Sequence, residues 1–190
     1  LLERFVSDSE SSGQISMETV GIEDTKEILL QIITQGKVLG QKYWVAVTNP
    51  PYAAGSNLSM KVNNYLKKNY PDSKADLFAV FIERCGQMII DKGYQAMITQ
   101  QVWMFISSLE KLRKIILNLS IVNMAHLGTK AFEDISGEVV QTTSFVLRKS
   151  HIENYCGLYK RLVFCNGQNE KEKNFLLKNN KYFSNQSNFK

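Results

Sequence analysis

The chain has 190 residues, of which 44% are hydrophobic and 22% are charged, a composition typical of a globular domain rather than a disordered or fibrous chain. It contains no run of eighteen apolar residues, so the sequence predicts no membrane-spanning helix. The formal net charge of +5 is compatible with a polyanionic partner, although many proteins without one are as basic. Cys85, Cys156 and Cys165 show no Cys-x-x-Cys spacing, which disfavours a disulfide framework and a metal site and favours a reducing cytoplasm.

Helical and strand patterns alternate along the chain. Residues 1–20 are rich in Ser, Glu and Gly and indicate a linker, and apolar residues at helical spacing predict a helix over 23–39. Later patterns predict strands over 43–48, 94–99, 121–127 and 139–147, helices over 77–89 and 109–119, and a polar, basic stretch over 61–74. We therefore expect an α/β domain with a largely parallel sheet.

Local signals predict where the two later helices begin and end. Asp72 or Ser73 is expected to cap the helix over 77–89, and Gly93 is expected to mark its end. Ser107 and Glu110 have the Ser-x-x-Glu spacing of a capping box, which predicts the start of the helix over 109–119.

A strand followed at once by two prolines is the feature with the clearest chemical meaning. The apolar, β-branched run 43–48 predicts a parallel strand buried on both faces, and Asn49-Pro50-Pro51-Tyr52 follows it directly. This tetrapeptide is therefore expected at the carboxyl edge of the sheet, where open α/β folds bind their ligands. The alternative interpretation is a rigid surface turn without a catalytic role.

The tetrapeptide has the groups that methylation of a conjugated amine requires. The lone pair of such a nitrogen is delocalised, so the nitrogen must be pushed towards tetrahedral geometry before it can attack an electrophilic methyl group. The Asn49 side-chain carbonyl and the Pro50 backbone carbonyl can accept the two N–H bonds, and Pro50 and Pro51 hold that geometry in advance. Tyr52 offers a flat face for an extruded base. A planar amide nitrogen poses the same problem, so the motif alone does not select the substrate.

Several stretches resemble methyltransferase motifs. Asn49-Pro50-Pro51-Tyr52, then Ala75-Asp76-Leu77-Phe78-Ala79-Val80-Phe81, then residues 93–99 follow the motif order of the amino-methyltransferases. Residues 65–74 (YLKKNYPDSK) and 125–132 (AHLGTKAF) more narrowly resemble the PglX family, the adenine-specific methyltransferases of bacterial BREX phage-defence systems. The resemblance covers residues 43–150, and the ending 185–189 (NQSNF) also resembles a later PglX segment.

This resemblance implies a Rossmann-like sheet with S-adenosylmethionine at one half and the target base at the other. It implies methyl transfer to N6 of adenine in duplex DNA, with base flipping. Asn49 and Pro50 would bind the amine, and Tyr52 would stack on the extruded adenine. Phe132 is a candidate for the opposite stacking face, and Phe81 would lie near the adenine of the cofactor.

The sequence departs from the family pattern in one respect. A glycine-rich cofactor loop, aromatic-x-Gly-x-Gly, is expected before the tetrapeptide, but none of the eleven glycines lies two residues from another. We therefore expect the C-terminal half of a methyltransferase sheet, truncated at both ends and unable to bind S-adenosylmethionine by itself. Residues 1–42 would lead into the sheet, 43–150 would form the catalytic half-domain, and 151–190 would begin a downstream region with a candidate role in DNA recognition.

Other basic residues allow two interpretations each. Lys67, Lys68 and Lys74 are candidates for contacts with DNA phosphates, and a solvated loop explains them equally well. The lysines of the Asn- and Lys-rich tail 166–190 form either a DNA-facing surface or an exposed, disordered segment. His126, near the end of a predicted strand, is more simply explained as a structural histidine than as a catalytic one.

Two further functions remain open from the sequence. Enzymes that methylate a protein glutamine or an RNA guanine amine also carry Asn-Pro-Pro-Tyr, although the PglX-like stretches argue against that substrate. A non-catalytic DNA-binding or scaffold module is the other, and the missing cofactor loop favours it for this chain taken alone. The expected partners are double-stranded DNA and other phage-defence components, with no membrane, in a bacterial cytoplasm.

Overall fold

The computed structural model describes residues 17–132, 140–177 and 180–189, and the chain divides into two compact units after Gln41. The first unit contains one long helix, α2 (Met17–Gly40), which includes the predicted helix over 23–39 and begins before it. Ile28 and Leu39 are among several apolar side chains exposed along α2. No helix within the described ranges combines the length and the apolar character needed to cross a bilayer.

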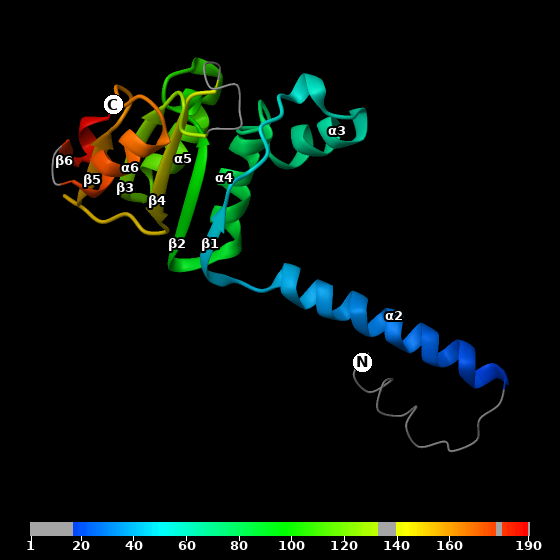
Figure 1. The fold of residues 1–190 in the computed structure, drawn as a ribbon. Coiled ribbons are helices and arrows are strands. Elements are labelled where there is room, and N and C mark those ends of the chain that lie inside the picture. The colour runs from blue at the N-terminus through cyan, green and yellow to red at the C-terminus, as the bar shows by residue number, and fades with distance from the viewer. Residues whose placement is uncertain (1–16, 133–139, 178–179, 190) are drawn as a thin grey trace. The chain divides into compact units, whose positions relative to one another are not determined.

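The second unit is built on a six-stranded sheet (Figure 1). Its strands are β1 (Tyr43–Thr48), β2 (Ile89–Gln100), β3 (Ser120–Gly128), β4 (Thr142–Arg148), β5 (Cys156–Arg161) and β6 (Lys181–Asn185). They lie in the order β1-β2-β4-β3-β5-β6. The pairs β1–β2 and β3–β5 are parallel, and the pairs β2–β4, β3–β4 and β5–β6 are antiparallel. The α/β prediction is confirmed, but the expectation of a largely parallel sheet is wrong because β4 turns back between β2 and β3.

Strand β1 confirms the predicted strand over 43–48 but not its burial on both faces. Trp44 is 71% exposed and Val47 is 74% exposed. The strand lies at one edge of the sheet, with β2 as its neighbour. An apolar strand becomes buried only where further elements cover it, and the described part of the second unit leaves these side chains uncovered.

Gly93 lies inside β2, not at the end of the preceding helix. A Cβ atom at this position would come within 2.9 Å of the backbone oxygens of Ile90 and Trp44. Glycine at 93 therefore permits the close approach of β1 to β2, so the prediction that it ends a helix is wrong.

Helices α4 (Leu77–Met88) and α5 (Glu110–Leu117) enclose the main core against the sheet. The fully buried members of this core include Phe78 and Ala79 from α4, Leu112 and Ile116 from α5, and Phe145 and Leu147 from β4. These helices confirm the predicted elements over 77–89 and 109–119, since the apolar face of each is the face that packs inward.

The predicted helix starts differ from the observed ones. Asp76 caps α4 by accepting a hydrogen bond from the Phe78 N–H at 3.3 Å, so neither Asp72 nor Ser73 has that role. Ser73 instead donates its hydroxyl to the Glu83 carboxylate at 2.6 Å. The N-cap of α5 is Leu109, which makes no capping side-chain bond, so the predicted box between Ser107 and Glu110 is not formed.

Two helices of the described residues have no counterpart among the predicted elements, one in the polar, basic stretch and one in the tail. Helix α3 (Met60–Asn69) lies in the polar, basic stretch 61–74, and Ser59 caps it by accepting from the Val62 N–H. Its inward contacts come from Leu66, together with Tyr70 just beyond its end, which pack against Val80 of α4. With so few apolar residues on α3, helical periodicity does not reveal it.

The described part of the tail 166–190 forms a helix and a strand of the sheet, so the expectation of a disordered segment is wrong, although most of its side chains are exposed as expected. Helix α6 (Gln168–Leu176) carries Lys171, which is 5% exposed. Its Nζ donates to the backbone oxygens of Leu127 at 2.8 Å, Leu162 at 3.0 Å and Cys165 at 2.8 Å. Burial lowers the pKa of the Lys171 ammonium, because the charge has left water. These three bonds fasten α6 to the ends of β3 and β5.

We expect Lys171→Met to destabilise the fold by at least about 2 kcal/mol, because the Leu127 and Cys165 oxygens lose this donor and a buried carbonyl without a donor costs about 1–3 kcal/mol. Urea denaturation followed by circular dichroism measures this change. Lys173→Met is the matched control, since Lys173 is an exposed lysine of the same helix, and its effect should stay within about 0.5 kcal/mol. Equal effects of the two substitutions would contradict the role given to Lys171.

Candidate active site

Asn49-Pro50-Pro51-Tyr52 leaves the sheet at the carboxyl end of β1. Because β1 and β2 are parallel, the residues that follow β2 emerge at the same edge. Asn49 and Pro51 are exposed, Pro50 is buried, and Tyr52 is partly buried. The side-chain amide of Asn49 is therefore accessible to a ligand, while Pro50 is held by packing.

The ring of Tyr52 is fixed against α4. It meets the ring of Phe78 edge to face, with centroids 6.2 Å apart and planes at 87°. Its hydroxyl oxygen is buried and has no hydrogen-bond partner among the described residues. Burial raises the pKa of the Tyr52 phenol, so the hydroxyl stays protonated at neutral pH. Tyr52 is thus arranged as a fixed aromatic surface rather than as an acid or base.

The backbone after the tetrapeptide is tied to the start of α4. The Gly55 N–H donates to the Ala75 oxygen at 3.1 Å, and the Leu77 N–H donates to the Ala53 oxygen at 3.0 Å. The Asp76 carboxylate accepts from the Ala53 N–H at 3.1 Å. From the sequence, Asp76 is identified only as part of a helix motif. No local signal reveals its contact with a residue 23 positions earlier.

Asn63 of α3 holds the next part of this loop, and sequence reasoning missed it. Its side-chain amide donates to the backbone oxygens of Gly55 at 2.7 Å and Leu58 at 3.1 Å. The segment between the tetrapeptide and α3 is therefore fixed from two sides.

Lys67 and Lys74 face the same space, whereas Lys68 does not. Both of the former line a cavity of about 490 Å³ together with Gly55 and Ser56, just beyond Tyr52 in the chain. All three lysines are exposed. The structure thus brings two of the three predicted phosphate contacts together, beside the loop that follows the tetrapeptide.

The two predicted phenylalanines belong to different parts of the chain's fold, one on a helix and the other after a strand. Phe81 is on α4, partly buried and packed against the main core. Phe132 follows β3, is partly buried, and adjoins residues 133–139, which lie outside the described ranges. The ring contacts of the described residues do not include one between Tyr52 and Phe132. The roles of these two rings on opposite faces of an extruded base therefore stay predictions.

A chain of polar side chains lies along the same edge of the sheet. His126 of β3 shares a hydrogen bond with the side-chain oxygen of Gln101, which follows β2, and the Gln101 amide donates to Gln141, which precedes β4. Burial, and then the nearby Arg161 guanidinium, lower the pKa of His126. A neutral histidine with a side-chain partner agrees with the structural role expected for it.

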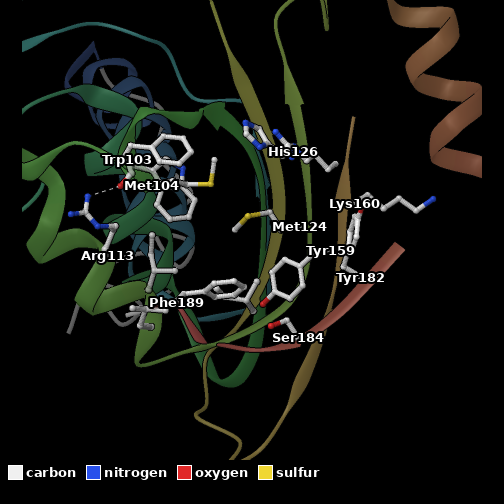
Figure 2. Close-up of a pocket in the computed structure, with 15 residues that line it drawn as sticks. Trp103, Met104, Arg113, Met124, His126, Tyr159, Lys160, Tyr182, Ser184 and Phe189 are labelled. Atoms are coloured by element: carbon white, nitrogen blue, oxygen red, sulfur yellow. Dashed lines mark hydrogen bonds between the residues drawn. The ribbon is translucent and has the colours of Figure 1, made fainter. Parts of the chain in front are cut away.

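Another cavity lies beside α5 and strands β3, β5 and β6, with a volume of about 590 Å³. Figure 2 shows Trp103 and Met104 on one side of it and Tyr159 and Phe189 on the other. Arg113 on its wall already donates to the Trp103 backbone oxygen at 2.9 Å. Burial raises the pKa of the Tyr159 phenol to about 12. No residue of the tetrapeptide lines this apolar cavity, so it is distinct from the candidate active site.

We expect Tyr52→Phe to leave stability unchanged or to raise it by up to about 1 kcal/mol, because it removes a buried hydroxyl without a partner. Phe78→Ala should instead cost about 3–5 kcal/mol, since Phe78 is 1% exposed and supports the Tyr52 ring. Thermal denaturation of both variants provides the comparison. A clear loss of stability in Tyr52→Phe would show that the hydroxyl has a partner in solution.

Comparison with known proteins relates this chain to restriction-modification methylases. Residues 9–132 match the family described as Eco57I restriction-modification methylase. The chain is 43% identical over 176 residues to the adenine-specific methyltransferase PglX of Lacticaseibacillus casei (strain Zhang), an alignment that covers 93% of the chain and 15% of PglX. It is 42% identical over 165 residues to the adenine-specific methyltransferase BrxX of Escherichia coli O9:H4 (strain HS), covering 85% of the chain and 14% of BrxX. The chain therefore spans about one seventh of the length of these relatives.

Solved structures share the fold at low sequence identity. A nuclease-deletion mutant of the Type ISP restriction-modification enzyme LlaGI, in complex with a DNA substrate mimic, has a TM-score of 0.53 at 14% identity, over 89% of the chain and 16% of that structure. The Type IIG restriction endonuclease BpuSI has a TM-score of 0.52 at 14% identity, over 76% of the chain and 19% of that structure. The family match and these likenesses confirm the prediction of a truncated, Rossmann-like methyltransferase sheet.

Proposed function

Because the chain belongs to the Eco57I restriction-modification methylase family, we propose that it is the target-base half of a longer enzyme that methylates N6 of adenine in duplex DNA. The observation that carries this proposal is the fixed Asn49-Pro50-Pro51-Tyr52 at the carboxyl end of β1, with Asn49 exposed. Two relatives named as adenine-specific methyltransferases support adenine as the base. The biological role that follows is self-marking of DNA in a phage-defence or restriction-modification system.

Asn49 and Pro50 hold the adenine amine. The Asn49 side-chain oxygen accepts one N–H, and the Pro50 backbone oxygen accepts the other. Both bonds draw the amine hydrogens out of the ring plane, so the nitrogen lone pair becomes available for attack. The prolines fix the direction of the Pro50 carbonyl before the substrate arrives, which avoids reorganisation during the reaction.

Tyr52 holds the extruded base through its ring. Base–aromatic stacking is worth about 1–3 kcal/mol per base, and the Tyr52 ring is already fixed by Phe78, so little side-chain freedom is lost on binding. Phe132 is assigned to the opposite face of the base. The buried Tyr52 hydroxyl takes no part in proton transfer.

S-adenosylmethionine supplies the methyl group when it is bound. In this chain, Phe81 is the residue assigned to the cofactor's adenine, because it is only partly buried at the border of the main core. The sequence holds no Gly-x-Gly loop. The other cofactor contacts are therefore assigned to regions of the longer enzyme outside this chain.

Lys67 and Lys74 are assigned to a DNA phosphate beside the extruded nucleotide. They line a cavity together with Gly55 and Ser56, only a few residues beyond Tyr52. Lysine contacts with phosphate supply affinity that is independent of sequence and falls with salt. In this proposal, the lysines that bind a DNA phosphate lie a short distance along the chain from the residues that bind the base.

In the full-length enzyme, Asn49→Ala should reduce the methylation rate by at least about a hundredfold while DNA affinity changes little, because the lost acceptor acts mainly in the transition state. Asn49→Asp should keep partial activity, since a carboxylate still accepts the N–H. Mass spectrometry of N6-methyladenine in digested DNA measures the rate, and fluorescence anisotropy measures affinity. A near wild-type rate for Asn49→Ala, or methyl groups found on protein instead of DNA, would refute the proposal.

Lys67→Ala and Lys74→Ala should each weaken DNA binding and reduce the slope of log affinity against log salt concentration by about 1. Lys68→Ala is the matched control, because it removes the same charge from the helix that carries Lys67, and Lys68 does not line the cavity. Titrations of labelled duplex DNA across a salt series measure both quantities. If all three variants behave alike, net charge rather than this cavity determines binding.

A further inference from the structure

Asp76 makes a contact that its position at a helix start does not require. One oxygen of its carboxylate, Oδ1, accepts from the Phe78 N–H at 3.3 Å, which is ordinary capping of α4. The same oxygen accepts from the Ala53 N–H at 3.1 Å, in the residue directly after the tetrapeptide. A single oxygen thus joins the first turn of α4 to the end of the Asn-Pro-Pro-Tyr segment.

This second bond fixes the peptide group between Tyr52 and Ala53. A peptide bond is planar, so holding the Ala53 N–H also sets the direction of the Tyr52 carbonyl. Pro50 and Pro51 already have fixed φ angles, which leaves few soft torsions between β1 and this peptide. With β1 anchored at one end and Ala53 at the other, the tetrapeptide is restrained from both sides.

Neighbouring backbone bonds hold the same two segments together but not this peptide. The Gly55 N–H donates to the Ala75 oxygen, and the Ala53 oxygen accepts from the Leu77 N–H. Neither atom belongs to the Tyr52–Ala53 peptide group. The Ala53 N–H is left to the Asp76 side chain. Side-chain chemistry at position 76 therefore decides the orientation of the Tyr52–Ala53 peptide.

We infer that Asp76 is a positioning residue that sets the geometry of Tyr52 and, through the restrained segment, of the Pro50 carbonyl; this role rests on the proposed function. It acts on catalysis through the Ala53 N–H and does not touch the substrate. Misplacement of a reacting group by about 1 Å can cost about a hundredfold in rate, so loss of the tether should appear in kcat.

Three substitutions in the full-length enzyme separate the tether from the cap. Asp76→Asn keeps an oxygen at the same distance along the side chain, so both bonds can form. Asp76→Ser keeps a good helix cap, but its hydroxyl lies closer to the backbone and does not reach Ala53. Asp76→Ala loses both bonds. We expect kcat at saturating DNA and cofactor to fall about tenfold to a hundredfold in the Ser and Ala variants and no more than about threefold in the Asn variant.

The melting temperature should depend on whether position 76 still caps α4, and not on the bond to Ala53. The Ser and Asn variants should melt near the wild type, and only the Ala variant should melt lower. A wild-type kcat in Asp76→Ser would overturn the inference, because capping would then be the whole role of Asp76. An Asn variant as slow as the Ala variant would also overturn it, because the accepting oxygen would then not be what matters.

Hydrogen exchange of the segment 49–56, read by mass spectrometry, tests the tether without reference to activity. Pro50 and Pro51 carry no amide hydrogen, so protection of the Ala53 amide is a large part of the signal. It should be lost in the Ser and Ala variants and kept in the Asn variant. Unchanged protection in Asp76→Ala would overturn the inference even in an active enzyme. Absence of adenine methylation by the wild type, with protection changing as expected, would refute the proposed function alone.

Discussion

The hydrogen bonds between residues 53–55 and 75–77 fasten the loop after β1 to the start of α4, and the candidate active site depends on them. The same turn of α4 sends Phe78 into the main core and against the ring of Tyr52. The position of Tyr52 is therefore determined by how α4 packs on the sheet. A rigid proline pair would have little value for catalysis if the chain beyond it were free to move.

Buried and exposed lysines have different roles in this fold, although they contribute equally to the net charge. Lys171 and Lys160 are 5% and 7% exposed and donate to backbone oxygens, so they hold α6 in place. Lys67 and Lys74 are exposed around a cavity beside the site loop. A buried ammonium without an acidic partner needs several carbonyl oxygens around it, and Lys171 has three. Charge alone is thus a weak guide to the role of a lysine.

Elements with strong periodicity were predictable, and elements held by a few contacts were not. Helices α4 and α5 and strands β1 to β4 follow apolar patterns that local sequence reveals. Helix α3 has little more than Leu66 facing inward, and the tail owes its packing to Lys171 and Gln186, which are polar residues. Gln186 donates to the backbone oxygens of Leu117 and Leu119 at 2.7 and 2.6 Å, a contact across more than sixty residues that no pattern indicates.

The sequence by itself determined the place of the tetrapeptide after a strand and the α/β class, because these depend on residue type and on short-range spacing. Only the tertiary structure decided the antiparallel insertion of β4, the exposure of β1, and the separation of Lys67 and Lys74 from Lys68. It also decided that Asp76 reaches back to Ala53. Each of these depends on which distant segments meet, and such meetings follow from the packing of the whole sheet and its helices rather than from local preference.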